Sequence, residues 1–470
     1  MNHKKLLLTL TLCLCALLCM VVTASASEVS VHSNHFSCGV ADCQNNDHGH
    51  TQVTEWQPWT GPQSASEDNI PYDPETKTAY IYLADNVQIS DALTIPKDHT
   101  LYLCLNGHDI IRTGNLIQIQ EDASFTLCDC KGDKAEYGKL DSNKGGRAVS
   151  FGGSKTGTFT MYGGIITGGN VTGNSGGVFV GDKKTFTMYG GTITGNSARY
   201  TGGGVVVYGA FNMYGGAITG NSAQEGGGGV AAHGTFNMYG GAITDNTCNG
   251  SYNGGGVYVK NGTWSTGAIT LSGSVQIKDN YKGSNSNKKP SNLYLTNNKT
   301  INVVGPLTGS SIGVTTAAEP GTGSNVITFA NGNANTITTG IFTPDTAGVL
   351  VGVAADGTSA YLYKCSHVYE WAYDEEYHWK KCTNVGCDSV EAGSKKAHTW
   401  DYPADYNNPK TCVCGATQGE PLTRSYYYYA PSAAEDKKDS PKTADPGVLL
   451  YAGLALASLT GLACAAKKRH

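Results

Sequence analysis

The chain has 470 residues, a formal net charge of −5, 62 glycines, 27 tyrosines and only 15% charged residues. This composition excludes a highly charged disordered polymer and a typical helical enzyme, and it favours a turn-rich all-β protein. Between residues 27 and 443 there are 28 basic and 37 acidic residues, which argues against a nucleic-acid partner.

The first 26 residues have the organisation of a secretory signal peptide. Lys4 and Lys5 precede an uncharged, mostly apolar run over residues 6–22, and a small-residue site ends at Ala26. We expect cleavage after Ala26 and therefore export. An uncleaved membrane helix is the alternative.

Residues 27–74 form a segment with cysteines and histidines before the repeats. Its candidate metal ligands are His35, Cys38, Cys43 and His48. Thiolates and imidazoles can complete a tetrahedral zinc site, whereas disulfides are the competing interpretation for an exported protein.

Residues 75–364 carry the dominant signal, an internal repeat. A Phe-x-Met-Tyr-Gly-Gly block recurs with spacings of 27, 25 and 25 residues, beginning at Phe159, Phe186, Phe211 and Phe236. Each unit has three short β-prone runs separated by Gly and Asn, and it cannot bury its apolar residues alone. The repeat therefore predicts a right-handed parallel β-helix with irregular coils and caps at its ends.

The period of two along each strand assigns side chains to the two faces. Phe186 and Met188 should point inward and Thr187 outward. Three asparagines at a spacing of 25 residues should form a hydrogen-bonded ladder along the axis: Asn196, Asn221 and Asn246. Four tyrosines fall at one position of successive coils, as a stiffening stack or as a platform for a ligand: Tyr162, Tyr189, Tyr214 and Tyr239.

The repeat is similar to those of β-helix surface proteins of Gram-positive gut bacteria. Its Gly-Gly-Ala-Ile tetrads, at Gly215 and Gly240, also resemble those of polymorphic outer-membrane proteins. The resemblance covers roughly residues 75–365 and implies a fold, not an activity.

Upstream of the regular repeats, Cys104 and Cys128 follow the equivalent starts of two consecutive coils. Parallel stacking would bring them within disulfide range, or leave them as unpaired side chains in register. Acids are densest over residues 122–141, whereas residues 151–280 contain only four acids. We therefore assign no catalytic residue, and an irregular polysaccharide lyase or hydrolase site near residues 122–141 is the enzymatic alternative.

Residues 365–419 form a second Cys/His-rich module. Its candidate metal ligands are His378, Cys382, Cys387, Cys412 and Cys414, with a structural zinc ion or disulfides as the two alternatives. Residues 420–443 are rich in Tyr, Ala and charged residues and are typical of a flexible stalk.

Residues 444–470 are organised as an anchor. An uncharged, mostly apolar run over residues 448–466 is long enough to cross a membrane, and Lys467, Lys468 and Arg469 follow it on the cytoplasmic side. The preceding segment resembles the sorting signal of Gram-positive surface proteins, with Ser for the usual leading Leu and Ala for Gly: Ser440, Pro441, Lys442, Thr443 and Ala444. The resemblance implies that a sortase joins Thr443 to the cell wall. A membrane anchor that is never cut is the alternative.

Together these features predict a non-enzymatic adhesin on the surface of a Gram-positive bacterium. The expected ligand is an extracellular glycan or protein, and the expected attachments are the cell wall or the plasma membrane. A polysaccharide-cleaving enzyme and a passive structural spacer are the two alternatives.

Overall fold

The computed structural model describes residues 35–36, 52–53, 56–62, 69–131, 136–250, 253–262, 265–284, 287–321, 325–329, 340–355, 357–384, 387, 389–400 and 409–419. The chain divides into two units, residues 1–397 and 398–470, and each is described by itself. The predicted signal peptide, stalk, sorting signal and anchor lie outside the described residues.

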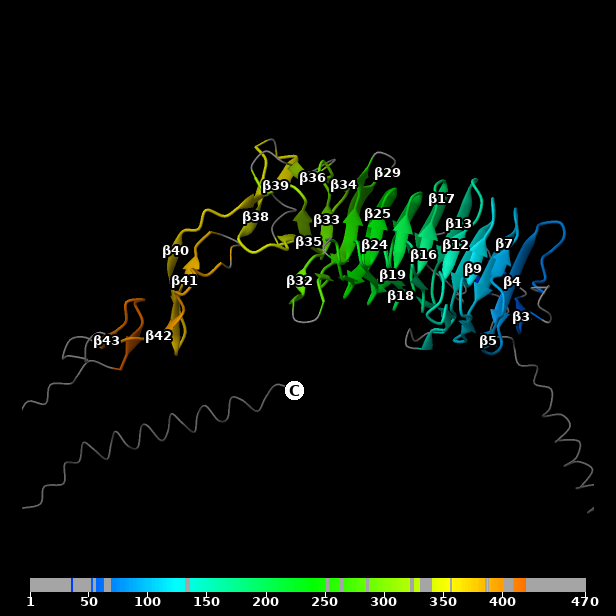
Figure 1. Ribbon diagram of the computed structural model, residues 1–470, viewed down its shortest axis with the longest axis horizontal. Helices are drawn as coiled ribbons and strands as arrows, with labels where there is room; N and C mark the ends of the chain where they lie inside the picture. The colour runs from blue at the N-terminus through cyan, green and yellow to red at the C-terminus, as the bar shows by residue number, and fades with distance from the viewer. Residues whose placement is uncertain are drawn as a thin grey trace, which may run out of the picture. The chain divides into compact units, whose positions relative to one another are not determined.

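The first unit contains a parallel β-helix of about ten turns, as the repeat predicted (Figure 1). Each turn contributes strands to three ladders, and strands of successive turns pair in parallel and in register. The handedness predicted for the coil stays a prediction.

The first ladder, here called the phenylalanine ladder, carries the Phe-x-Met blocks. Its strands are β4 (Thr78–Leu83), β7 (Thr100–Cys104), β10 (Ser124–Cys128), β13 (Gly157–Met161), β17 (Lys184–Met188), β21 (Ala210–Met213), the first parts of β25 (Thr235–Thr244) and β30 (Ala268–Ile277), β34 (Ile301–Val303) and β36 (Asn325–Phe329). At its start, β3 (Gln57–Trp59) pairs in parallel with β4.

The second ladder follows the corner at the end of the first, and in the four regular coils a Gly-Gly pair forms this corner. Its strands are β5 (Val87–Gln88), β8 (Ile110–Ile111), β11 (Lys139–Asp141), β14 (Ile165–Thr167), β18 (Thr192–Thr194), β22 (Ala217–Thr219), the second parts of β25 and β30, β35 (Ser311–Thr316) and β37 (Phe342–Pro344).

The third ladder contains short, mostly apolar runs, which follow the glycine clusters in the regular coils. Its strands are β6 (Leu93–Ile95), β9 (Ile117–Ile119), β12 (Val149–Phe151), β16 (Val178–Val180), β20 (Val205–Val207), β24 (Val230–Ala232), β27 (Val257–Val259), β33 (Leu293–Leu295) and the end of β35.

Shorter strands complete the described chain. A small parallel sheet contains β15 (Asn170–Val171), β19 (Ser197–Ala198), β23 (Ser222–Ala223), β26 (Thr247–Cys248) and β31 (Tyr281–Lys282), with β32 (Lys289–Pro290) antiparallel at its end. Antiparallel pairs are formed by β1 (His35–Phe36) with β2 (Gln52–Val53), β28 (Asn261–Gly262) with β29 (Ser265–Thr266), β38 (Val349–Val353) with β39 (Ser359–Lys364), β40 (Tyr369–Tyr373) with β41 (Tyr377–Cys382), β41 with β42 (Lys396–Ala397), and β43 (Lys410–Thr411) with β44 (Thr417–Gln418).

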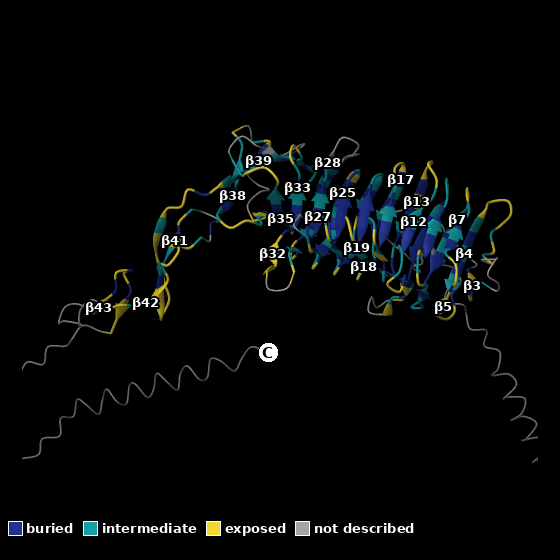
Figure 2. Cartoon of the chain, in the orientation of Figure 1, coloured by how far each residue is buried: buried dark blue, intermediate teal, exposed yellow. Residues whose placement is uncertain are grey.

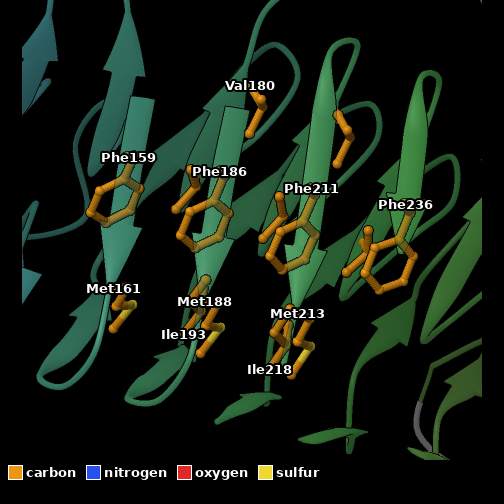
Figure 3. Packing of buried hydrophobic residues seen from close by; sticks show 14 of the residues in the cluster. Phe159, Met161, Val180, Phe186, Met188, Ile193, Phe211, Met213, Ile218 and Phe236 are labelled. Carbon is orange, nitrogen blue, oxygen red and sulfur yellow. The ribbon is translucent and has the colours of Figure 1, made fainter. Parts of the chain in front are cut away.

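The interior is a continuous apolar column, and buried residues appear as dark blue stretches along the strands in Figure 2. Phe186 and Met188 are fully buried, as the alternation along the strand predicted. Phenylalanine rings of successive coils stack with centroids 4.6–5.2 Å apart, and the methionines line up beside them (Figure 3). Burying one such side chain stabilises the fold by roughly 1.5–3 kcal/mol.

The Gly-Gly pairs are required by the corner between the first two ladders. The second glycine of a pair, such as Gly216, has a φ of +82°, which side chains disfavour. A Cβ on the first glycine, Gly215, would lie 2.5 Å from the carbonyl oxygen of Tyr189 in the preceding coil. Close stacking of the coils therefore excludes a side chain at both positions.

Beyond the last coils, antiparallel strands close the solenoid. Strand β39 pairs antiparallel with both β36 and β38, so it covers the last strand of the phenylalanine ladder. An open edge would expose unpaired backbone groups to other chains, so a cap of this kind is expected for a solenoid.

Candidate functional site

The outward side of the phenylalanine ladder carries a tyrosine stack. Each tyrosine of the stack directly follows an inward methionine and therefore points away from the core; the four are Tyr162, Tyr189, Tyr214 and Tyr239. Their ring centroids lie 5.0, 5.0 and 4.9 Å apart with interplanar angles of 7°, 14° and 29°. Tyr214 is 44% exposed. The structure thus brings the four predicted residues together, and their role in binding stays a prediction.

A polar row runs parallel to this stack. The row consists of the residues two positions before the tyrosines, which pair in register from coil to coil: Thr160, Thr187, Asn212 and Asn237. The Nδ2 of Asn237 donates to Oδ1 of Asn212 at 2.9 Å. We call these two columns in four successive coils the tyrosine face. It contains no charged side chain in these four coils, and it offers hydroxyl and amide groups beside aromatic edges.

Towards the N-terminus the same column contains thiols. Cys104 and Cys128 are register partners, as predicted, and both are fully buried beside Trp56 and Tyr102. Both cysteines are in the reduced, thiol form, the Sγ of Cys128 donates to the carbonyl oxygen of Leu103 at 3.5 Å, and burial raises the pKa of Cys104 well above its ordinary value. This environment favours inert packing groups over reactive thiolates.

Asp122 and Asp129, two of the acids of residues 122–141, accept hydrogen bonds from nearby residues. Buried Asp129 accepts hydrogen bonds from the N–H groups of Gly107, Lys131 and Gly138, and burial raises its pKa despite them. Asp122 accepts a hydrogen bond from Thr156 Oγ1 at 2.6 Å, which lowers its pKa. These hydrogen bonds give both carboxylates a structural role, so their positions need no catalytic explanation.

An open hollow of about 540 Å³, which the sequence did not predict, lies where the chain passes from the third ladder to the phenylalanine ladder. Tyr208 and His233 line it, with ring centroids 4.7 Å apart. Burial, and secondarily the charge of Lys260, lower the pKa of His233 to about 4. Gly209 and Gly234 recur 25 residues apart, but the side chains of Tyr208 and His233 at the equivalent position differ in type, so no repeated side chain marks the hollow.

A Cys/His cluster lies in the first unit. The ligand atoms of Cys365, His367, Cys382 and Cys387 all lie within 4.8 Å of one another, and they could hold a metal ion. Burial raises the pKa of Cys382, but the N–H of Asn384, His367 and the neighbouring thiols lower it to about 6. Cys382 and Cys387 were predicted ligands, whereas Cys365 and His367 were not among them.

The other predicted ligands lie elsewhere. In the second unit, Cys412 and Cys414 lie beside His398, with Cys414 Sγ 3.6 Å from His398 Nδ1. His378 is buried on β41, where Trp371 contacts its ring edge-to-face at 4.9 Å. The side chain of His35, and all of Cys38, Cys43 and His48, lie outside the described residues.

Comparison with protein-family models, with curated proteins and with solved structures found no match to this chain. In the part of the chain that the structure describes, no helix is long and apolar enough to cross a membrane. The parallel β-helix is compatible with a scaffold, an adhesin or a polysaccharide lyase.

Proposed function

We propose that the chain is a non-enzymatic adhesin that binds extracellular glycans through the tyrosine face. The observation that carries this proposal is the tyrosine face itself, an uncharged aromatic and amide surface repeated over four coils. Tyrosine offers a rigid amphipathic contact with little loss of side-chain entropy, and Asn and Thr supply adaptable hydrogen bonds. This combination suits hydroxyl-rich ligands with apolar C–H surfaces.

In this proposal the signal peptide ending at Ala26 exports the chain, and the segment after Ser440 attaches it to the cell wall or plasma membrane of a Gram-positive bacterium. A sortase would join Thr443 to the wall. The solenoid would be right-handed, and the flanking Cys/His modules would be stapled by zinc or by disulfides. The order of sequence signals at the two ends supports this part of the proposal, because it resembles that of wall-anchored surface proteins.

The test is direct binding of residues 27–430 to glycan and matrix-protein arrays, with a parallel assay for polysaccharide cleavage. The proposal predicts a specific glycan ligand that is bound and released unchanged. Cleavage of a bound polysaccharide would establish the enzymatic alternative, and neither binding nor cleavage would leave a passive spacer.

A further inference from the structure

Four side chains with sulfur or nitrogen donors converge where the cap of the solenoid meets the following hairpin. We propose that Cys365, His367, Cys382 and Cys387 bind one structural zinc ion, which fastens the β40–β41 hairpin to the cap. This inference is independent of the proposed glycan binding.

The spacing of the donor atoms fits a tetrahedral ion. Cys365 Sγ lies 3.6 Å from Cys382 Sγ, and Cys387 Sγ lies 3.4 Å from His367 Nδ1. Sulfur ligands about 2.3 Å and nitrogen ligands about 2.0–2.1 Å from a tetrahedral zinc ion are separated from one another by about 3.5–3.8 Å. Two edges of the required tetrahedron are therefore almost formed.

The number of cysteines favours a metal over a disulfide. Three buried cysteines contribute to the cluster, with exposed fractions of 8% for Cys365, 5% for Cys382 and 4% for Cys387. Their sulfur atoms all lie within 4.8 Å of one another. A disulfide between any two would leave the third thiol buried beside it. A zinc ion uses all three thiolates, and a donor set without carboxylates excludes the hard cations calcium and magnesium.

Asn384 supports the thiolates from outside the donor set. Its Nδ2 donates to Cys365 Sγ at 3.0 Å and to the carbonyl oxygen of Ser366 at 2.8 Å. Its backbone N–H is directed at Cys382. Donors of this kind orient metal ligands and stabilise their negative charge.

The site joins two structural elements. Cys365 directly follows β39, and its N–H donates to the carbonyl oxygen of Gly348 at 2.7 Å, just before β38. Leu350 of β38 and Tyr363 of β39 pack against the sulfur cluster, while Cys382 ends β41. Four protein ligands fill the tetrahedron, so the ion would be structural and would have no open position for catalysis.

The full chain, purified without chelator, gives the first test through thiol accessibility and metal content. We expect bound zinc, and we expect the three cysteines to be alkylated after chelator treatment without any reductant. Peptide mapping that finds Cys365, Cys382 or Cys387 in a disulfide would overturn the proposal. This measurement needs no variant and is therefore unaffected by misfolding.

The second test compares zinc content in Cys387→Ser, His367→Ala and, as the matched control, Cys248→Ser. Cys248 is also buried but lies in the solenoid, away from the donor set. The first two variants should each lose about one equivalent of zinc relative to wild type, whereas the control should lose none. Equal zinc content in all three variants and wild type would contradict the site.

Discussion

Single asparagines connect successive coils through their buried amides. Asn221 is 1% exposed, and its Oδ1 accepts hydrogen bonds from the backbone N–H and the Nδ2 of Asn196. Its Nδ2 donates to Asn246 Oδ1 at 3.0 Å and to the carbonyl oxygen of Ile193 at 2.9 Å. Each amide therefore satisfies backbone groups in its own coil and in its neighbours, which no apolar side chain can do.

Asn221→Ala should lower the free energy of unfolding by roughly 2–3 kcal/mol, because it leaves buried donors and acceptors in two coils without partners. Urea unfolding measures the loss. Asn212→Ala removes an amide from the half-buried outward row and should cost less than about 1 kcal/mol. Equal losses in the two variants would show that the buried ladder has no special role.

His233 links stability to pH. Its pKa of about 4 in the folded chain lies below the ordinary value of 6.5, so the unfolded chain binds a proton more readily. Its contribution to stability is therefore complete above pH 6.5 and falls as the pH drops towards 4, by about 3 kcal/mol in all. Denaturant unfolding at several pH values should show that His233→Gln removes this part of the slope. An unchanged slope in the variant would assign the pH dependence to other groups.

A coil of 25 residues is the structural unit at the scale of elements. Removing residues 211–235 joins Ala210 to Phe236, so the phenylalanine, methionine and asparagine positions stay in register with the preceding coil. The shortened chain should keep its β-sheet circular dichroism and a cooperative unfolding transition, because each coil contacts mainly its neighbours.

The matched control removes residues 211–234, one residue fewer. Phe236 would then take an outward position and Thr235 an inward one, since the side-chain period is two. This control should misfold or aggregate. If both shortened chains folded equally well, the inward or outward position of each residue in the repeat would not determine the packing.

The regular elements could be predicted because their residues recur at a fixed spacing. The ladder Asn196, Asn221 and Asn246 follows from the spacing of 25, but it continues through Asn280 and Asn292 at spacings of 34 and 12, which no period reveals. The Cys/His cluster follows no period either, so the sequence did not predict that Cys365 and His367 lie beside Cys382. The β40–β41 hairpin separates Cys365 and His367 from Cys387 in the chain, and folding brings these residues together.

On the scale of the whole molecule, the parallel β-helix is a scaffold that repeats one outward surface. The same register that stacks Phe186, Phe211 and Phe236 inside also aligns Tyr189 and Tyr214 outside. A ligand with repeating units can contact several coils at once, which raises affinity without any single strong site. We therefore expect glycan binding to depend on the residues of the tyrosine face together, not on one of them.

The affinity of the double variant Tyr189→Ala and Tyr214→Ala for the array-identified glycan shows whether the tyrosine face binds the ligand. Tyr200→Ala is the matched control, because Tyr200 is as exposed as Tyr214 but lies outside the tyrosine face. The double variant should bind the glycan at least about tenfold more weakly than wild type, while the control should bind like wild type. Unchanged affinity of the double variant would show that the tyrosine face is not the glycan-binding surface.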